Sequence, residues 1–373
     1  MRILILVRIL WTAGAQKIAI SEAKTLTSMG HKVKLVFLRS EPSGNNLLSE
    51  LKSVDYEIMA PEEYKSKKIF IYITTIFSHE RKAGGTVDYD LLRSFSKSFM
   101  CGDFDYIICH DPWAGYAGYK IHKRCGVPYS VMIHERFQKE PGHFPLGYIT
   151  DQIQYKILKS ASSIFTVTKK VEESLTEKFG LSGITNYPGM DLKSHYDFLS
   201  KTNTIIASAT WDRDRDPRRY LRILEHLSDF NLLIVGRWRN EEDYEKFLNE
   251  LSRYDYAKQV MIKTSIDEQS LQELYASAKF SIRFGTNEYG LGTSNIEAIS
   301  HLTPVIIDSQ LGLVDIVNNL GGGLVVENEN FDEVSTFIKL NNVKESYEIL
   351  QKNLIKITNQ YTWKAHCEIL IKI

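Results

Sequence analysis

Short apolar runs alternate with longer amphipathic segments over most of the chain. Examples are Ile3–Val7, Tyr106–Cys109 and Ser163–Val167, each followed by a segment whose apolar residues recur at helical spacing. The short runs predict strands, and the segments between them are long enough to be crossover helices. Strands joined by such crossovers predict a parallel sheet with helices on both faces.

The same pattern starts again in the second half of the chain. Its apolar runs are Thr204–Ser208, Asn231–Val235, Val260–Ile262, Phe280–Phe284, Pro304–Ile307 and Gly323–Val326. Between the first two runs, Pro217–Leu227 is expected to form a helix. Two successive series predict an α/β protein with two Rossmann-like, doubly wound domains, which agrees with a length of 373 residues. Ligands of such sheets bind at the carboxyl ends of the strands, so we expect a site in a cleft across which the domains face each other.

Composition and charge exclude some classes of protein. Lys and Arg together number 46, as do Asp and Glu, so the net charge is zero. Binding to a phosphate backbone leaves a basic excess, so no nucleic acid is expected as a partner. The four cysteines form no C-x-x-C pair, which predicts a reducing, cytoplasmic location without a disulfide framework. Their spacing indicates no metal site, and no D-x-D cluster is placed to bind a metal.

Two apolar segments bear on export and membrane contact. Residues 1–15 superficially resemble a secretion signal, but Arg8 interrupts the run and a helical pattern follows. No segment approaches the roughly 20 apolar residues of a membrane span. The segment Ile69–Phe77 follows a lysine cluster at 65–68. A peripheral contact with the cytoplasmic membrane face is one interpretation of this segment, and a buried strand or core helix turn is the simpler one.

The segment from Glu288 to Glu297 carries the clearest chemical signal. Two acids bracket a turn of small residues at which a helix begins. The first amides of a helix have no intrahelical acceptor and attract anions such as phosphate, which makes Gly292, Thr293 and Ser294 candidate binding residues. A carboxylate beside a phosphate site is useful only if it accepts hydrogen bonds from hydroxyl groups. The pattern therefore predicts a site for a nucleotide sugar or a similar ligand.

The chain resembles family 4 of the glycosyltransferases, which have the GT-B fold of two Rossmann-like domains. The motifs that carry the resemblance are Ala13–Lys17, His110–Gly115, Met132–Glu135, Tyr187–Asp191, Ser265–Ala278, Glu288–Glu297 with Thr303–Ile306, and Tyr361–Trp363. They resemble, in turn, the family's glycine turn, its "H-D" and "H-E" strand ends, its interdomain link, a helix, the two-glutamate motif and the start of a closing helix. The resemblance implies an acceptor domain at 1–190, a donor domain at 200–355, and a helix at 356–373 that crosses back to the first domain.

Two departures from the family pattern concern the donor site. The family places seven residues between its glutamates, whereas eight separate Glu288 and Glu297, which one inserted residue near Tyr289 would explain. The family also carries an arginine and a lysine on the first loop of the second domain. Here Arg215 falls on the lysine position, and either Arg213 stands in for the arginine or nothing does.

The resemblance implies a retaining transfer of a hexose from a UDP-, GDP- or ADP-sugar to a hydroxyl of a glycan, lipid-linked or small-molecule acceptor. Charge builds on the departing diphosphate, so Arg215, Arg213 and the amides of the Gly292 turn are expected to stabilise it. Glu297 is expected to accept hydrogen bonds from ribose hydroxyls, and Glu288 from the donor sugar. No cofactor or metal is needed, because the nucleotide sugar is a co-substrate.

The first domain is expected to supply the remaining groups. Its Gly14 and Ala15 would let the backbone approach the ligand, and His134 would donate a hydrogen bond near the reacting sugar. Glu135, with the loop Arg136–Tyr148, would form the acceptor wall, whereas His110 is interpreted as structural. Glu288, His134 and Arg215 are thus the candidate catalytic residues.

Three other functions are consistent with parts of the pattern. A nicotinamide-dependent oxidoreductase is disfavoured because Ala13-Gly14-Ala15 is not a G-x-G-x-x-G fingerprint. A catalytically inactive GT-B scaffold or sugar-binding subunit would explain both departures from the family pattern. A sugar-nucleotide epimerase would use the same fold and consume the donor without an acceptor. The sequence leaves the base, sugar, acceptor and oligomeric state undetermined.

Overall fold

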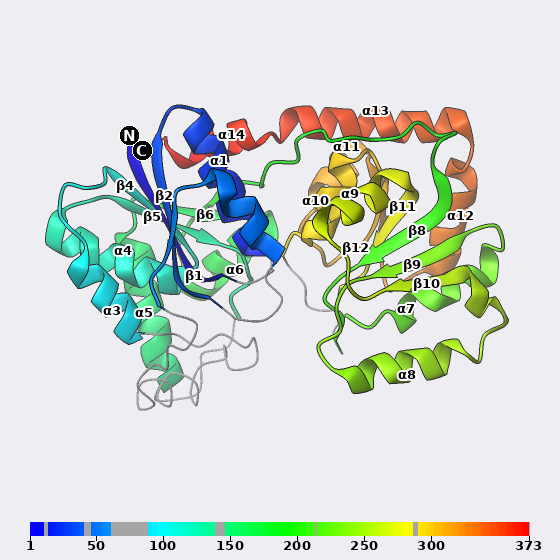
Figure 1. Cartoon of the computed structure of the whole chain (residues 1–373), viewed down its shortest axis with the longest axis horizontal. Coiled ribbons are helices and arrows are strands. Elements are labelled where there is room, and N and C mark those ends of the chain that lie inside the picture. The colour runs from blue at the N-terminus through cyan, green and yellow to red at the C-terminus, as the bar shows by residue number, and fades with distance from the viewer. Residues whose placement is uncertain are drawn as a thin grey trace. The chain divides into compact units, whose positions relative to one another are not determined.

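The structure is a computed structural model that describes residues 1–10, 14–40, 46–60, 89–138, 146–212, 215–285 and 290–372. Its contacts divide the chain into two compact units (Figure 1). The first unit consists of Met1–Pro188 together with Trp363–Ile373, and the second of Gly189–Thr362. Each unit is a parallel α/β structure, which confirms the predicted class of two Rossmann-like domains.

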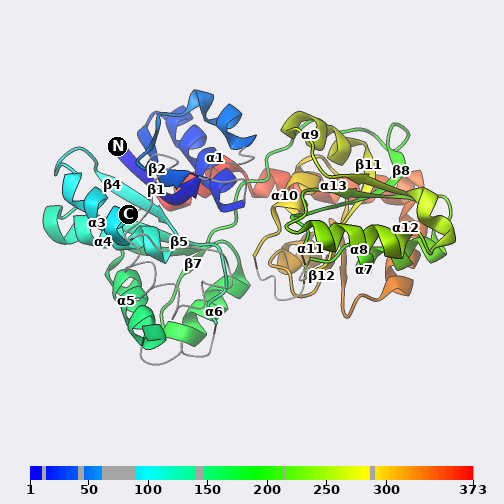
Figure 2. The ribbon, with the colours of Figure 1, turned by 60° about the horizontal axis from the view of Figure 1, so that its bottom comes forward.

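The first unit contains one sheet with the strand order β3-β2-β1-β4-β5-β6-β7. The strands are β1 (Arg2–Leu10), β2 (Lys32–Ser40), β3 (Tyr56–Ile58), β4 (Tyr106–His110), β5 (Tyr129–Ile133), β6 (Ser163–Thr166) and β7 (Ile184–Thr185). The helices are α1 (Gly14–Ser28), η1 (Asn46–Ser53), α3 (Tyr89–Ser98), α4 (Pro112–Cys125), α5 (Leu146–Ser160), α6 (Lys169–Phe179) and α14 (Trp363–Leu370). Helix α1 packs with η1 and α14, whereas α4 packs with α3 and α5 against the other face of the sheet (Figure 2).

The core of the first unit depends on small residues in α4. A Cβ at Gly115 would lie 2.8 Å from a methyl group of Ile157, and one at Gly118 would lie 2.8 Å from Cys109 Sγ. Both glycines therefore let α4 approach the sheet and α5 closely. The helix begins at Asp111, which caps it, and ends before Gly126 in the left-handed conformation.

The second unit contains a sheet with the strand order β10-β9-β8-β11-β12-β13. The strands are β8 (Thr202–Ser208), β9 (Asn231–Val235), β10 (Val260–Lys263), β11 (Ala278–Arg283), β12 (Val305–Asp308) and β13 (Gly323–Val326). The helices are α7 (Arg218–Leu221), η3 (Arg222–His226), α8 (Glu241–Leu251), η4 (Asp255–Gln259), α9 (Glu268–Ser277), α10 (Thr293–Ser300), α11 (Val314–Leu320), α12 (Phe331–Asn341) and α13 (Lys344–Gln360). The apolar runs predicted as strands are all strands, but the helix predicted at Pro217–Leu227 is divided between α7 and η3.

The strand orders define a switch point in each sheet. The direction in which successive strands are added to the sheet reverses between β1 and β4 in the first unit, and between β8 and β11 in the second. In open α/β sheets, ligands bind beyond the carboxyl ends of the two strands at such a point. Side chains that follow Leu10, His110, Ser208 and Arg283 are therefore the ones placed to form sites.

The cysteines require a correction. Cys101 and Cys125 form a disulfide across 24 residues of sequence, with a Cα–Cα distance of 5.3 Å, whereas the sequence predicted no disulfide. The disulfide joins the turn after α3 to the last residue of α4. The spacing gave no signal of it, because only the packing of α3 on α4 brings the two cysteines together. Cys109 and Cys367 are buried thiols.

None of the helices in the described part of the chain combines the length and apolar character that crossing a bilayer requires. The segment Lys65–Phe77, considered above for a membrane-surface contact, lies outside the described residues.

Candidate functional site

A buried arginine marks the switch point of the second sheet. Arg283, the last residue of β11, is only 5% exposed, and its Nη1 donates a hydrogen bond to the carbonyl oxygen of Ser208 at 3.1 Å. Ser208 is the last residue of β8, so this bond joins the two strands that flank the switch point. Burial lowers the pKa of Arg283, but a guanidinium stays protonated at any relevant pH. The site therefore contains a positive charge that water solvates poorly.

The turn before α10 lies against this arginine. Gly292 caps the helix with φ 58° and ψ 87°, and a Cβ there would lie 2.9 Å from Asn295 Nδ2 and 3.9 Å from Arg283 Cγ. Thr293 and Ser294 follow as the first helical residues. The opening amides of a helix are oriented outward for an anion, and the positive φ explains why glycine stands at the cap. The helix start predicted from the sequence thus lies beside a cation that the sequence analysis did not include.

Glu297 lies on the first turns of α10 and forms an ion pair. Its Oε2 accepts a hydrogen bond from Lys193 Nζ at 2.5 Å, and 15% of its side chain is exposed. Lys193 also donates its backbone N–H to the carbonyl of Ser300 at 2.8 Å. The segment that enters the second unit therefore orients the carboxylate assigned to ribose binding.

The loop after β8 contains Arg215, which was predicted to contact the diphosphate of the nucleotide sugar. Arg215 is partly buried, and its backbone N–H donates to Asp212 Oδ1 at 3.0 Å. Trp211 is buried and pairs with Trp238 in a parallel bridge. The loop is therefore anchored on the sheet at its start. Arg213 and Glu288 lie outside the described residues, so their predicted roles stay predictions.

An ion pair lies at the switch point of the first sheet. Asp111 has φ 88°, a conformation that is rare for residues other than glycine. Its Oδ1 accepts hydrogen bonds from the amides of Trp113 and Ala114 at 2.8 Å each, and its Oδ2 accepts one from Arg8 Nε at 2.8 Å. The helix cap and the ion pair together hold the strained residue, and they explain why Arg8 interrupts the apolar first strand.

Four ionisable side chains form a hydrogen-bonded chain beside this ion pair. Glu22 of α1 is fully buried, and its two carboxylate oxygens contact His110 Nε2 at 2.8 Å and His366 Nε2 at 2.9 Å. His110 Nδ1 lies 2.9 Å from His134 Nε2. His366 Nδ1 lies 2.9 Å from the carbonyl oxygen of Tyr187. We call Glu22, His366, His110 and His134 the histidine chain.

The environment of the histidine chain shifts the pKa of two members. Burial alone would raise the pKa of Glu22, but the two contacting histidines outweigh it and lower that pKa to about 2. Removal from water is the main cause that lowers the pKa of His134 to about 3. Glu22 is therefore a carboxylate at neutral pH and His134 is a neutral imidazole. In the described part of the chain, no group of three or more His, Cys, Asp or Glu side chains has an arrangement that could hold a metal ion.

The other predicted site residues of the first unit are Gly14, Ala15, Glu135 and the loop that was expected to form the acceptor wall. Gly14 and Ala15 begin α1 and are partly buried at the carboxyl end of β1. Glu135 follows His134 and is exposed. Of the predicted acceptor wall, residues 139–145 lie outside the described part of the chain, and Phe137 packs edge-on against Phe179 at 5.0 Å.

Several site residues were missed by sequence reasoning. Arg283 was included in a predicted strand, although a charged residue at the end of a buried strand is a usable signal. Glu22 also lies on the apolar face of α1, where a buried carboxylate requires a partner. Lys193 and His366 gave no local signal, because their partners are distant in sequence.

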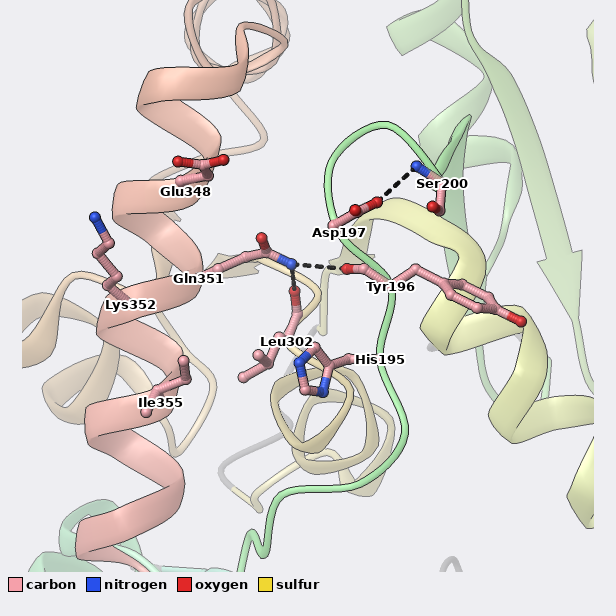
Figure 3. Close-up of a pocket in the computed structure, with 9 residues that line it drawn as sticks. All are labelled: His195, Tyr196, Asp197, Ser200, Leu302, Glu348, Gln351, Lys352 and Ile355. Carbon is pink, nitrogen blue, oxygen red and sulfur yellow. Dashed lines mark hydrogen bonds between the residues drawn. The ribbon is translucent and has the colours of Figure 1, made fainter.

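A hollow of about 440 Å³ lies elsewhere in the second unit, between the segment after Lys193 and helix α13 (Figure 3). Gln351 closes its floor by donating hydrogen bonds to the carbonyls of Tyr196 and Leu302 at 3.0 and 3.5 Å. None of the predicted site residues lines it. The hollow is therefore separate from the switch-point site.

The histidine chain predicts a loss of stability on acidification. Unfolded histidine binds a proton below about pH 6.5, whereas folded His134 binds one only near its pKa of about 3, so the unfolded state gains stability as pH falls through this window. At pH 5 the cost is about 2 kcal/mol. We expect thermal unfolding at pH 7.5 and 5.0 to show a smaller decrease in midpoint for His134→Gln than for the wild type. An equal decrease in both proteins would contradict the assignment, and His226→Gln, an exposed histidine of the second unit, serves as the control.

Two successive parallel α/β units are the architecture of GT-B proteins. The sequence matches the family described as Glycosyltransferase Family 4 over residues 12–193, and the family described as Glycosyl transferases group 1 over residues 193–358. The chain belongs to the family 4, group 1 glycosyltransferases, which confirms the resemblance drawn from the motifs.

Relatives and solved structures agree with this assignment. An uncharacterized glycosyltransferase of Methanocaldococcus jannaschii, MJ1607, is 22% identical over 264 residues, a match that covers 62% of this chain and 64% of that protein. The chain thus spans just under two thirds of the relative's length. The crystal structure of Anabaena Alr3699/HepE in complex with UDP has a TM-score of 0.76 at 14% identity and covers 99% of this chain and 98% of that one. Sucrose-phosphate synthase from Thermosynechococcus elongatus has a TM-score of 0.71 at 15% identity, with 99% and 97% covered. At these identities the solved structures show the fold alone.

Proposed function

We propose that this protein transfers a hexose from a nucleotide sugar to an acceptor hydroxyl, with retention of the anomeric configuration. The observation that carries the proposal is the arrangement at the second switch point. Arg283, the Gly292 turn and Glu297 there provide a cation, helix amides and a carboxylate. A nucleotide sugar needs these three kinds of group for its diphosphate and its ribose.

The main chemical requirement of the reaction is to stabilise the charge on the departing diphosphate. Negative charge grows on it as the glycosidic bond breaks, and donors fixed in advance stabilise that charge most when water is excluded. Arg283 is buried and held by Ser208, so it does not need to reorganise during the reaction. We assign Arg283 to the diphosphate together with Arg215. This assignment supplies a second cation for the diphosphate whether or not Arg213 stands in for the family arginine.

The proposal also concerns the base of the nucleotide sugar and whether the reaction needs a metal ion. The Anabaena structures contain UDP and UDP-glucose, which makes uridine diphosphate sugars the first donors to try. Arginine and helix amides neutralise the diphosphate without a divalent cation, so we propose a metal-independent reaction. We propose a glycan or a lipid-linked glycan as acceptor, and leave its identity to experiment.

A thermal-shift panel with UDP, GDP, ADP and their hexose conjugates tests donor binding. A ligand that binds only the native state raises the unfolding midpoint, by the equivalent of about 2.7 kcal/mol at a concentration of 100 times Kd. We expect a shift with one nucleotide series, and its loss in Glu297→Ala. Glu273→Ala, a carboxylate of α9 that accepts from the Tyr196 hydroxyl, is the matched control and should keep the shift. No shift with any nucleotide would favour the inactive scaffold, and donor consumption without an acceptor product would favour an epimerase or hydrolase.

A further inference from the structure

The histidine chain connects three buried residues with one that reaches the surface. Glu22 and His366 are 0% and 2% exposed, and His110 is 1% exposed, whereas His134 keeps part of its surface exposed at the carboxyl end of β5. The four side chains come from α1, α14, β4 and the residue after β5. Only His134 is therefore placed to touch a ligand, and the other three act on it through hydrogen bonds.

The hydrogen-bond partners of Glu22 and His366 determine which of their atoms carry protons. The Tyr187 carbonyl only accepts, so His366 Nδ1 carries a proton. The Glu22 carboxylate also only accepts, so His366 Nε2 and His110 Nε2 both donate to it. His366 thus carries protons on both nitrogens and forms a buried ion pair with Glu22. The pair as a whole is neutral, which is the condition under which buried charges are tolerated.

The same reasoning sets the direction of the next hydrogen bond. A second proton on His110 would be a buried charge without a counter-charge, because the one carboxylate already pairs with His366, so His110 is neutral. Since its Nε2 donates to Glu22, its Nδ1 has a lone pair and accepts from His134 Nε2 across 2.9 Å. The planes of the two rings differ by 18°, and their centroids lie 5.1 Å apart. A neutral His134 with its proton on Nε2 has a lone pair on Nδ1. That nitrogen is the one not used within the histidine chain.

We propose that Glu22 and His366, acting through His110, are positioning residues that hold His134 in the tautomer with an unprotonated Nδ1, so that His134 accepts a hydrogen bond from a hydroxyl of the transferred sugar. The sugar as ligand rests on the proposed function, whereas the direction of the hydrogen bond rests on the geometry of the chain alone. The direction is opposite to that expected from the sequence, in which His134 was a donor. A histidine that accepts from a hydroxyl binds sugars whose hydroxyl is free and disfavours those in which it is blocked.

The surroundings of the histidine chain do not reverse this direction. Moving the His366 proton onto the facing oxygen of Glu22 leaves His110 and His134 unchanged. Arg8 and Asp111, at the same switch point, pair with each other. The two neighbouring thiols are Cys109 and Cys367, and burial raises the pKa of Cys109 far above its usual value. Neither this ion pair nor these thiols therefore favour a proton on His134 Nδ1.

The ¹⁵N spectrum of the imidazole rings tests the direction without any ligand. The protein has ten histidines, and comparison with His134→Gln assigns the signals of His134. At pH 7 we expect its Nδ1 at the position of an unprotonated nitrogen and its Nε2 at that of a protonated one. A protonated Nδ1 would overturn the proposal, whatever the protein transfers. Loss of the fixed tautomer in Glu22→Leu would show that the buried pair sets it.

Two substitutions of His110 separate positioning from folding. Glutamine places its amide near the ring's Nε2, so His110→Gln keeps a contact to Glu22 and loses the one to His134. Asparagine mimics Nδ1 and does the reverse. We expect His110→Gln to weaken binding of UDP-glucose by about 10-fold and to leave UDP binding unchanged, since UDP lacks the transferred hexose. His110→Asn should lower the unfolding midpoint more and the affinity less, with His226→Gln as the matched histidine-to-glutamine control.

The outcomes distinguish this inference from the proposed function. Equal weakening of UDP and UDP-glucose by His110→Gln, or no weakening of either, would overturn the positioning role. Failure of every sugar nucleotide to bind the wild type would remove the proposed function. In that case the ¹⁵N spectrum still decides the hydrogen-bond direction on the protein as it stands.

Discussion

Glu22→Ala is expected to lower the unfolding midpoint of the first unit by roughly 6 to 20 °C. Removing one partner of a buried ion pair costs about 3–5 kcal/mol, because the remaining charge is left without compensation. Each kcal/mol corresponds to about 2–4 °C in a domain of this size. The substitution leaves the charge of His366 without a partner, because its other nitrogen donates to the Tyr187 carbonyl. It also removes the acceptor of His110 Nε2.

The matched control for this prediction is Glu57→Ala in the same unit. Glu57 pairs with Lys34 Nζ at 2.6 Å, but half of its side chain is exposed. Exposed ion pairs contribute about 0–1 kcal/mol, so we expect little change in the midpoint. Calorimetry of both variants and of Glu22→Gln measures the difference. Equal shifts for Glu22→Ala and Glu57→Ala would contradict the assignment of a buried ion pair.

Arg283→Met is expected to reduce the transfer rate by about 100- to 1000-fold while the second unit stays folded. The range is that for loss of one preorganised group that stabilises developing negative charge. Methionine fills much of the space of the arginine stem, and the change removes a poorly solvated charge, so the cost in stability is expected to be small. The measurement is kcat with the donor that the thermal-shift panel identifies, together with the Kd of its nucleoside diphosphate.

Arg253→Met provides the control for the arginine substitution. Arg253 is exposed in the same unit, beyond the end of α8, and should tolerate the change in both assays. If Arg283→Met binds the diphosphate as tightly as the wild type, then Arg283 has a structural role in the bond to Ser208. Arg283→Lys distinguishes charge from geometry, since lysine keeps the charge but cannot form the same fixed fork.

Periodicity was sufficient to predict the fold, because parallel strands buried on both faces appear as continuous apolar runs. Short elements escaped this reasoning: β7 has two residues, and β3 has three that are mostly exposed, so neither produces an apolar run. The helix predicted at Pro217–Leu227 is divided because backbone geometry changes to the tighter form after Leu221, a change that leaves apolar spacing nearly intact.

The candidate site was predictable only where its chemistry is local. The Gly292 turn and Glu297 belong to one contiguous motif, so spacing alone placed them together. Arg283 and Lys193 reach the same region from a strand end and from the interdomain link, and no local pattern connects them. The histidine chain is the extreme case, because Glu22 and His366 are 344 residues apart.

That separation has a consequence for how the protein is made. A ribosome adding about 5–20 residues per second needs roughly 20 to 70 s to reach His366 after Glu22 has been synthesised. Once β5 has been synthesised, the first unit has its central strands but still lacks α14, and its buried carboxylate has no cation opposite. The unit therefore gains its full stability only after the entire second unit has been translated. A ribosome that stops early releases a chain with an unpaired acid inside it, which is a product that cellular proteolysis can remove.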